Sequence, residues 1–72
     1  MIKIKDIKCN DTFYECERGF NDEFVATCDA YRKDNGWAVR GTHALHSYEV
    51  DFYVRDGFEA YGPKLYSAPA YI

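Results

Sequence analysis

Five side chains that could bind a metal or act in catalysis are spread along the 72-residue sequence. Structural zinc sites usually contain cysteine pairs roughly two to four residues apart. Here successive cysteines are seven and twelve positions apart. A cysteine with a histidine is also the minimal set for a thiol enzyme, but no nucleophile-elbow or phosphate-loop motif accompanies it. We therefore expect no enzyme, no catalytic residue, no cofactor and no metal, and leave open whether Cys9, Cys16, Cys28, His43 and His46 meet in the fold.

The charge of the chain is unevenly distributed. The net charge is -3, but residues 9–29 alone carry -5, and aromatic side chains stand among their acids. Exposed rings supply buried area to an interface, and surrounding acids speed association with a basic partner. The predicted partner-binding residues are Phe13, Tyr14, Glu15, Glu17, Phe20, Asp22 and Glu23.

This pattern favours a non-enzymatic protein-binding module, and specifically an inhibitor that occupies a basic surface of a partner protein. The alternative is nucleic-acid or nucleotide binding by a small aromatic-rich β-barrel. Its cations would be Lys3, Lys5, Lys8, Arg32, Lys33 and Arg40. The isoelectric point near 5.2 opposes binding to a phosphate backbone, so nucleic acid is the less favoured partner.

The location of the protein is predicted from what its sequence lacks. The first six residues include charges and do not resemble a secretory signal, and no apolar run approaches the roughly 18 residues of a membrane span. An odd number of cysteines is typical of a reducing compartment. We expect a cytoplasmic protein without membrane contact, with homo-oligomers possible through an exposed strand edge within residues 61–72.

The elements that must position these residues are predicted to be strands, because aromatic residues make up 18% of the chain. Residues 48–55 alternate clearly between apolar and polar side chains. Asp56-Gly57 is expected to turn them into a second arm at residues 58–61, and Asn35-Gly36 to join residues 23–33 to 37–42. Further strands are expected at residues 2–4, 12–17 and 64–66, with a loop at 18–22 and at most one weak helical turn at 42–47.

Together these elements predict one domain over residues 1–72, an all-β fold with five or six short antiparallel strands. We expect a small SH3-like barrel or a strongly bent sheet. Its predicted core consists of Ile2, Ile4, Phe24, Ala26, Trp37, Val39, Val50, Phe52 and Val54.

Two resemblances accompany this prediction. Residues 4–14 resemble the first strand and turn of SH3-like barrels, with Asn10 where glycine is usual, and asparagine tolerates the left-handed conformation. That resemblance implies a fold and no function. A short, acidic, aromatic-rich chain that starts directly into a strand also resembles small phage-encoded accessory or host-defence-inhibitor proteins, which implies a viral protein.

Overall fold

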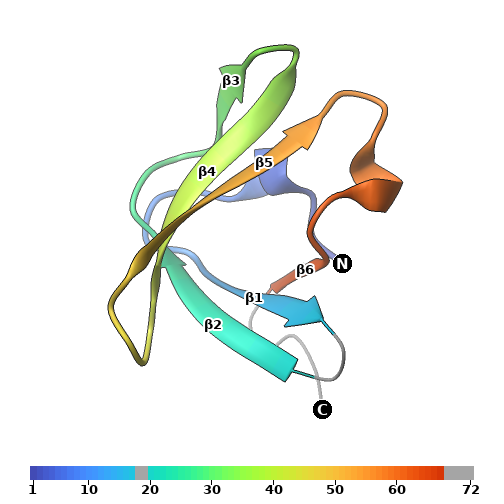
Figure 1. Cartoon of the computed structure of the whole chain (residues 1–72). Helices are drawn as coiled ribbons and strands as arrows, with labels where there is room; N and C mark the ends of the chain where they lie inside the picture. Colours follow the sequence, from blue (N-terminus) through green and yellow to red (C-terminus); the bar gives the residue numbers. More distant parts are fainter. Residues whose placement is uncertain (18–19, 68–72) are drawn as a thin grey trace.

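The computed structural model describes residues 1–17 and 20–67, and for Glu17 and Phe20 it describes the backbone only. Six strands form one antiparallel sheet, and the described residues contain no α-helix (Figure 1). The strands are β1 (Thr12–Glu17), β2 (Phe20–Ala26), β3 (Tyr31–Lys33), β4 (Gly36–His43), β5 (Glu49–Arg55) and β6 (Leu65–Ser67), and two 3-10 turns are η1 (Ile4–Asp6) and η2 (Glu59–Tyr61). The predicted all-β fold class is confirmed.

Strand β4 organises the sheet because both of its edges are paired. Strand β5 pairs along one edge, while β3 and β2 share the other, β3 opposite residues 36–38 and β2 opposite residues 41–43. Strand β1 pairs with β2, and β6 pairs with β1. The sheet bends so that β1, β2 and β6 curl away from β4 and β5, with η1 packed against β4 and β5 (Figure 1).

The core lies inside this bend and is centred on three phenylalanine rings. Phe13 stacks on Phe24 with ring centroids 5.8 Å apart, and Phe52 meets both edge-on at 5.3 and 5.0 Å. Edge-to-face packing suits the ring quadrupoles, so the cluster joins β1, β2 and β5 into one unit. Of the predicted core, Ile4, Phe24, Ala26, Val39, Phe52 and Val54 are buried, while Ile2, Trp37 and Val50 are half-buried and pack against it.

The predicted strand at the N-terminus is wrong, since residues 4–6 form the 3-10 turn η1. The Ile7 amide donates to the Ile4 carbonyl at 3.1 Å and closes the turn. Side chains three apart lie on the same side of a 3-10 turn, so Ile4 and Ile7 both enter the core. A strand would point Ile4 and Ile7 to opposite faces.

The predicted strand over residues 23–33 is broken after Ala26 by a bend. Its backbone groups bond to other parts of the chain: the Thr27 amide donates to the Arg40 carbonyl, and the Ala30 amide to the Ile7 carbonyl, each at 2.9 Å. The predicted loop at 18–22 is also shorter than expected, because β2 already begins at Phe20. The turn before β1 agrees with expectation, with Asn10 left-handed at φ 72°.

The hairpin between β3 and β4 exists, but its turn is displaced by one residue. Lys33 pairs with Gly36, and the two turn residues are Asp34 and Asn35, both with positive φ. Gly36 has a different role: a Cβ there would lie 2.5 Å from the Val54 carbonyl oxygen and 2.7 Å from the Tyr53 ring. Glycine at position 36 therefore permits the close approach of β5.

The second predicted hairpin is wrong. Gly57 adopts φ 82°, but the chain then enters η2 (Glu59–Tyr61) and does not form a strand at residues 58–61. The closing strand does form as β6, whose Leu65 is buried. Within the weak helical turn expected at 42–47, Thr42 and His43 belong to β4 and no helix forms. Residues 44–46 make a single turn, in which the Ser47 amide donates to the His43 carbonyl four residues earlier, at 2.9 Å.

Candidate functional site

The β1–β2 hairpin separates the predicted partner-binding residues onto two faces. Its register places Phe13 opposite Phe24, Tyr14 opposite Glu23, and Glu15 opposite Asp22. Side chains alternate along a strand, so Tyr14 lies on the opposite face from Phe13 and Glu15. Phe13 is only 1% exposed, and the prediction that it contacts a partner is wrong because its ring belongs to the core.

The outer face of the hairpin carries a row of three cross-strand neighbours. Tyr14 lies between Glu23 of β2 and Tyr66 of β6, and its hydroxyl lies 3.4 Å from the Glu23 carboxylate. Both tyrosines are half-buried, while Glu23 is exposed. Sequence reasoning missed Tyr66, although the alternation of β6 around Leu65 could have indicated its outward position.

The other face ends in a carboxylate held by a histidine. His43 is 5% exposed, and its Nε2 lies 3.2 Å from the Asp22 carboxylate. Its Nδ1 accepts hydrogen bonds from the backbone amides of Leu45 and His46 at 3.2 and 3.1 Å. An acceptor nitrogen carries no proton, so this geometry fits the uncharged tautomer in which Nε2–H donates to Asp22.

The remaining predicted contact residues have different environments. Glu15 is half-buried and lies between Asp22 and Leu65 in the sheet register. The side chains of Glu17 and Phe20 lie outside the described residues. Among the described residues, no lysine or arginine nitrogen lies within 4.0 Å of the carboxylates of Asp22 or Glu23.

The two histidines form a stack. The centroid of the His43 ring lies 4.7 Å from that of Tyr48 and 5.1 Å from that of His46, with interplanar angles of 23° and 25°. Within residues 1–17 and 20–67, no group of three or more potential ligands gathers closely enough to hold a metal ion. His43 thus orders the loop between β4 and β5 through its two backbone acceptor contacts.

All three cysteines are free thiols. Cys9 is exposed, whereas Cys16 and Cys28 are half-buried. Partial burial, and secondarily the neighbouring Glu15 carboxylate, raise the pKa of the Cys16 thiol. A raised pKa lowers the fraction of reactive thiolate, which makes Cys16 a poor nucleophile.

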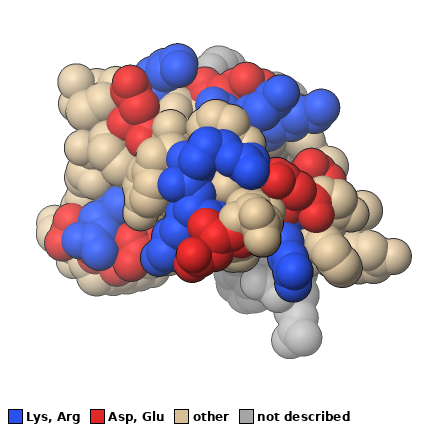
Figure 2. All heavy atoms as spheres, turned by 90° about the horizontal axis from the view of Figure 1, so that it is seen from above, with Lys and Arg blue, Asp and Glu red and all other residues tan. Residues whose placement is uncertain are grey.

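The cations of residues 30–40 are largely neutralised by acids from β5 and the following turn. Arg32 donates two hydrogen bonds to Asp56 at 2.9 and 2.8 Å, and Arg40 two to Asp51 at 2.7 and 3.1 Å. These bonds hold the pKa of each carboxyl below its ordinary value. Figure 2 shows acidic side chains beside basic ones on the face seen from above.

Comparison with known protein families, with curated proteins and with solved structures finds no match to this chain. Among the described residues, no helix is long and apolar enough to cross a membrane. The fold and the side-chain geometry are therefore the basis for any proposal about function.

Proposed function

We propose that this protein is a non-enzymatic binding module for a partner protein with a basic surface, and that it makes contact through the β1–β2 hairpin. The observation that carries the proposal is a difference in charge compensation. Arg32 and Arg40 each have an acidic partner. Glu23 on the outer face of the hairpin, and Asp22 on its other face beside His43, have no lysine or arginine partner among the described residues. A basic partner would supply the missing opposite charges.

Tyr14 is the proposed anchor of this contact, since Phe13, the neighbouring ring in the predicted set, is buried in the core. Its ring is half-buried and its hydroxyl is held near Glu23, so little side-chain entropy is lost on binding. Tyrosine is enriched among residues that dominate binding energy, and its neighbour Tyr66 widens the aromatic surface. The acids would mainly raise the association rate and select the partner.

The nucleic-acid alternative is less favoured because the chain carries a net charge of -3 and because Arg32 and Arg40, two of the six cations that would contact phosphates, are paired with acids. Arg32 and Arg40 would have to give up two-bond contacts to Asp56 and Asp51 before binding phosphates. Lys33 is the one lysine on the same hairpin, and the other three lysines of the set lie in the N-terminal segment, namely Lys3, Lys5 and Lys8. Inhibitory action, viral origin and a cytoplasmic location stay predictions.

Homo-oligomer formation also stays a prediction. Strand β6 pairs with β1 on one edge, and among the described residues no strand pairs with its other edge. The Ile2 amide donates to the Leu65 carbonyl at 2.9 Å and so satisfies one backbone group there.

A matched pair of double variants tests the proposed contact. Asp22→Asn with Glu23→Gln removes two negative charges but keeps oxygens that accept from His43 and Tyr14. Asp6→Asn with Glu59→Gln removes the same charge from exposed residues outside the hairpin. We expect tagged wild-type protein to retain one stoichiometric partner from nuclease-treated lysate. The hairpin variant should lose it, and the control variant should not.

Association kinetics with the purified partner give the second measurement. The hairpin variant should bind more slowly at low salt, with a flatter salt dependence, because steering charges act mainly on the association rate. Equal association rates for the hairpin and control variants would show that the contact lies elsewhere.

A further inference from the structure

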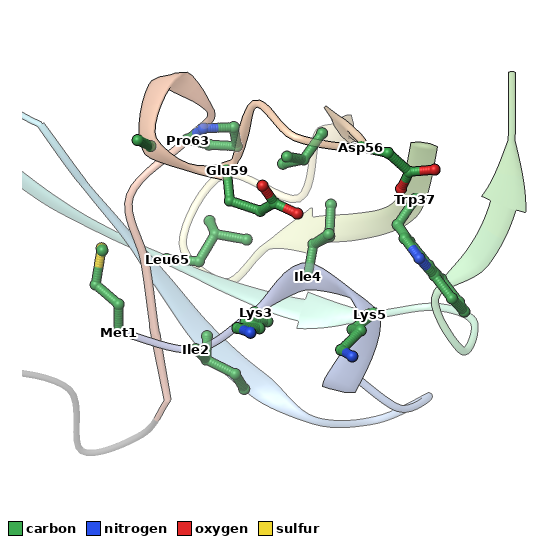
Figure 3. Close-up of a pocket in the computed structure, with 12 residues that line it drawn as sticks. Met1, Ile2, Lys3, Ile4, Lys5, Trp37, Asp56, Glu59, Pro63 and Leu65 are labelled. Atoms are coloured by element: carbon green, nitrogen blue, oxygen red, sulfur yellow. The ribbon is translucent and has the colours of Figure 1, made fainter. Parts of the chain in front are cut away.

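A groove of about 510 Å³ lies between the two 3-10 turns (Figure 3). Ile2 and Ile4 line one side, and Ala60 and Pro63 the other. Val54 of β5 and Leu65 of β6 also line the groove. The lining is therefore mainly aliphatic. Its volume falls in the range of about 300–1,000 Å³ that is typical of small-molecule sites.

The groove is held in shape by contacts outside it. Trp37 lines one end, and the Arg32 guanidinium lies 5.3 Å from the centre of its ring. Arg32 is in turn fixed by two hydrogen bonds to Asp56, which also lines the groove. At the opposite turn, Lys64 donates to the Ala60 carbonyl at 2.8 Å. A preformed site costs less ordering on binding than one that must assemble.

The charged side chains that line the groove, apart from the paired Asp56, carry a net charge of +1. Lys3 and Lys5 line the groove, and neither makes an ion pair or a side-chain hydrogen bond with a described residue. Asp56 is already neutralised by Arg32, so Glu59 is the one acid at the rim that lacks a cationic partner within the described residues. Two open cations against one open acid make this groove locally basic in a chain whose net charge is -3.

We propose that this groove binds a free amphiphile with an aliphatic or aromatic body and one anionic group, of the fatty-acid or aryl-acid class. The apolar body would lie on Ile4, Val54 and Leu65, and the anionic group would lie near Lys3 and Lys5. Glu59 opposes the anion and limits affinity. This site is separate from the β1–β2 surface, so either proposal can fail without the other.

Trp37 makes the proposal directly measurable, because it is the only tryptophan of the chain and lines the groove. Purified protein is titrated with decanoate, decanol and decylammonium, each below its micelle-forming concentration, while tryptophan fluorescence is recorded. We expect a saturable one-to-one change with decanoate, weaker binding of decanol, and the weakest binding of decylammonium. A second pair of probes, anilinonaphthalene sulfonate and its neutral parent phenylnaphthylamine, differs only in the anionic group and should give the same order.

Charge variants then test whether the anionic group of the ligand lies beside Lys3 and Lys5. Lys3→Gln with Lys5→Gln should weaken decanoate binding about three- to tenfold, because an exposed ion pair contributes up to about 1 kcal/mol. Glu59→Gln should strengthen it about two- to threefold and weaken decylammonium binding by a similar factor. Lys8→Gln with Lys33→Gln is the matched control, since it removes two exposed lysines that do not line the groove.

Four results would overturn the proposal. These are no saturable fluorescence change, equal affinity for decanol and decanoate, equal weakening by the two lysine pairs, and a response to anionic phospholipid vesicles without one to free decanoate. The last result would assign the groove to a lipid surface. Thermal melting of each variant distinguishes loss of binding from loss of folding. Ile2→Ser gives a second test, because it removes apolar surface at the groove without changing charge and should weaken decanoate binding.

Discussion

The β3–β4 and β1–β2 hairpins differ in how far their charged side chains are paired with opposite charges. On β3–β4, each arginine meets an aspartate from β5 or the turn after it, although those partners lie 24 and 11 positions away in sequence. On β1–β2, Asp22 and Glu23 pair with no lysine or arginine among the described residues. Charge counted along the sequence therefore misjudges the surface, because a segment of +2 becomes nearly neutral once the fold supplies its partners. Within the described part of the chain, the fold supplies no lysine or arginine partner to Asp22 or Glu23 of the acidic segment.

The largest effect is expected from the two faces of the β1–β2 hairpin. Phe13→Ala should lower the free energy of unfolding by about 3–5 kcal/mol, because it empties the centre of the phenylalanine cluster. Tyr14→Ala, one position along, should cost only about 1 kcal/mol, since its ring is half-buried. Urea denaturation of both variants measures the difference. Equal costs would mean that the hairpin does not have one core face and one outer face.

A smaller effect is expected where the β3–β4 hairpin meets β5. Gly36→Ala should destabilise the protein by about 1–3 kcal/mol, because its Cβ would clash with the Val54 carbonyl and the Tyr53 ring. The Tyr53 hydroxyl donates to the Asp34 carbonyl at 2.6 Å, so the ring is not free to move away. Gly57→Ala is the comparison, with open space around the new Cβ and only the strain of φ 82°. A larger loss at Gly57 would show that backbone conformation outweighs the close approach.

The sequence predicted the parts of this fold that depend on local pattern. Alternation located β5, the Asn35-Gly36 turn signal located the hairpin of β3 and β4, and the tolerance of asparagine for positive φ located the turn at Asn10. It failed where distant contacts decide the outcome. Residues 4–6 form a 3-10 turn because Ile4 and Ile7 both reach the core. The backbone groups after Ala26 bond to Ile7, just after η1, and to Arg40 of β4.

The candidate site was predicted only in part for the same reason. The composition of residues 9–29 indicated an acidic surface with aromatic residues, but it could not separate Tyr14 from Phe13 until the register of β1 was known. The alternation of β6 indicates that Tyr66 points outward, but its place beside Tyr14 has no local signal. Nor has the groove between η1 and η2, since both depend on segments from the two ends of the chain.

The ion pairs of the basic hairpin predict a pH dependence at low pH. The arginine partners lower the pKa of Asp51 and Asp56 below the ordinary 3.8, so their stabilisation is present above that value and is lost as pH falls through the lower folded value. Wild type and Asp51→Asn with Asp56→Asn should therefore differ in stability at pH 6 and converge as the pH drops well below 3.8. Thermal melting of both proteins across this pH range measures the difference in stability. A constant difference at all pH values would show that the asparagines act through packing.

The smallest effect is expected for nucleic-acid binding, and it tests the comparison of the two hairpins most directly. If ion pairing is what prevents Arg32 and Arg40 from contacting phosphates, then Asp51→Asn with Asp56→Asn should give weak binding to a single-stranded oligonucleotide at low salt. The logarithm of affinity should fall with the logarithm of salt concentration with a slope up to about 1.4 units steeper than in the wild type, about 0.7 for each new phosphate contact. Asp22→Asn with Glu23→Gln changes the net charge equally but releases neither arginine, so its slope should match the wild type. Fluorescence anisotropy of a labelled oligonucleotide measures all three proteins. Equal slopes for the two double variants would show that net charge, and not the pairing of Arg32 and Arg40, keeps phosphates away.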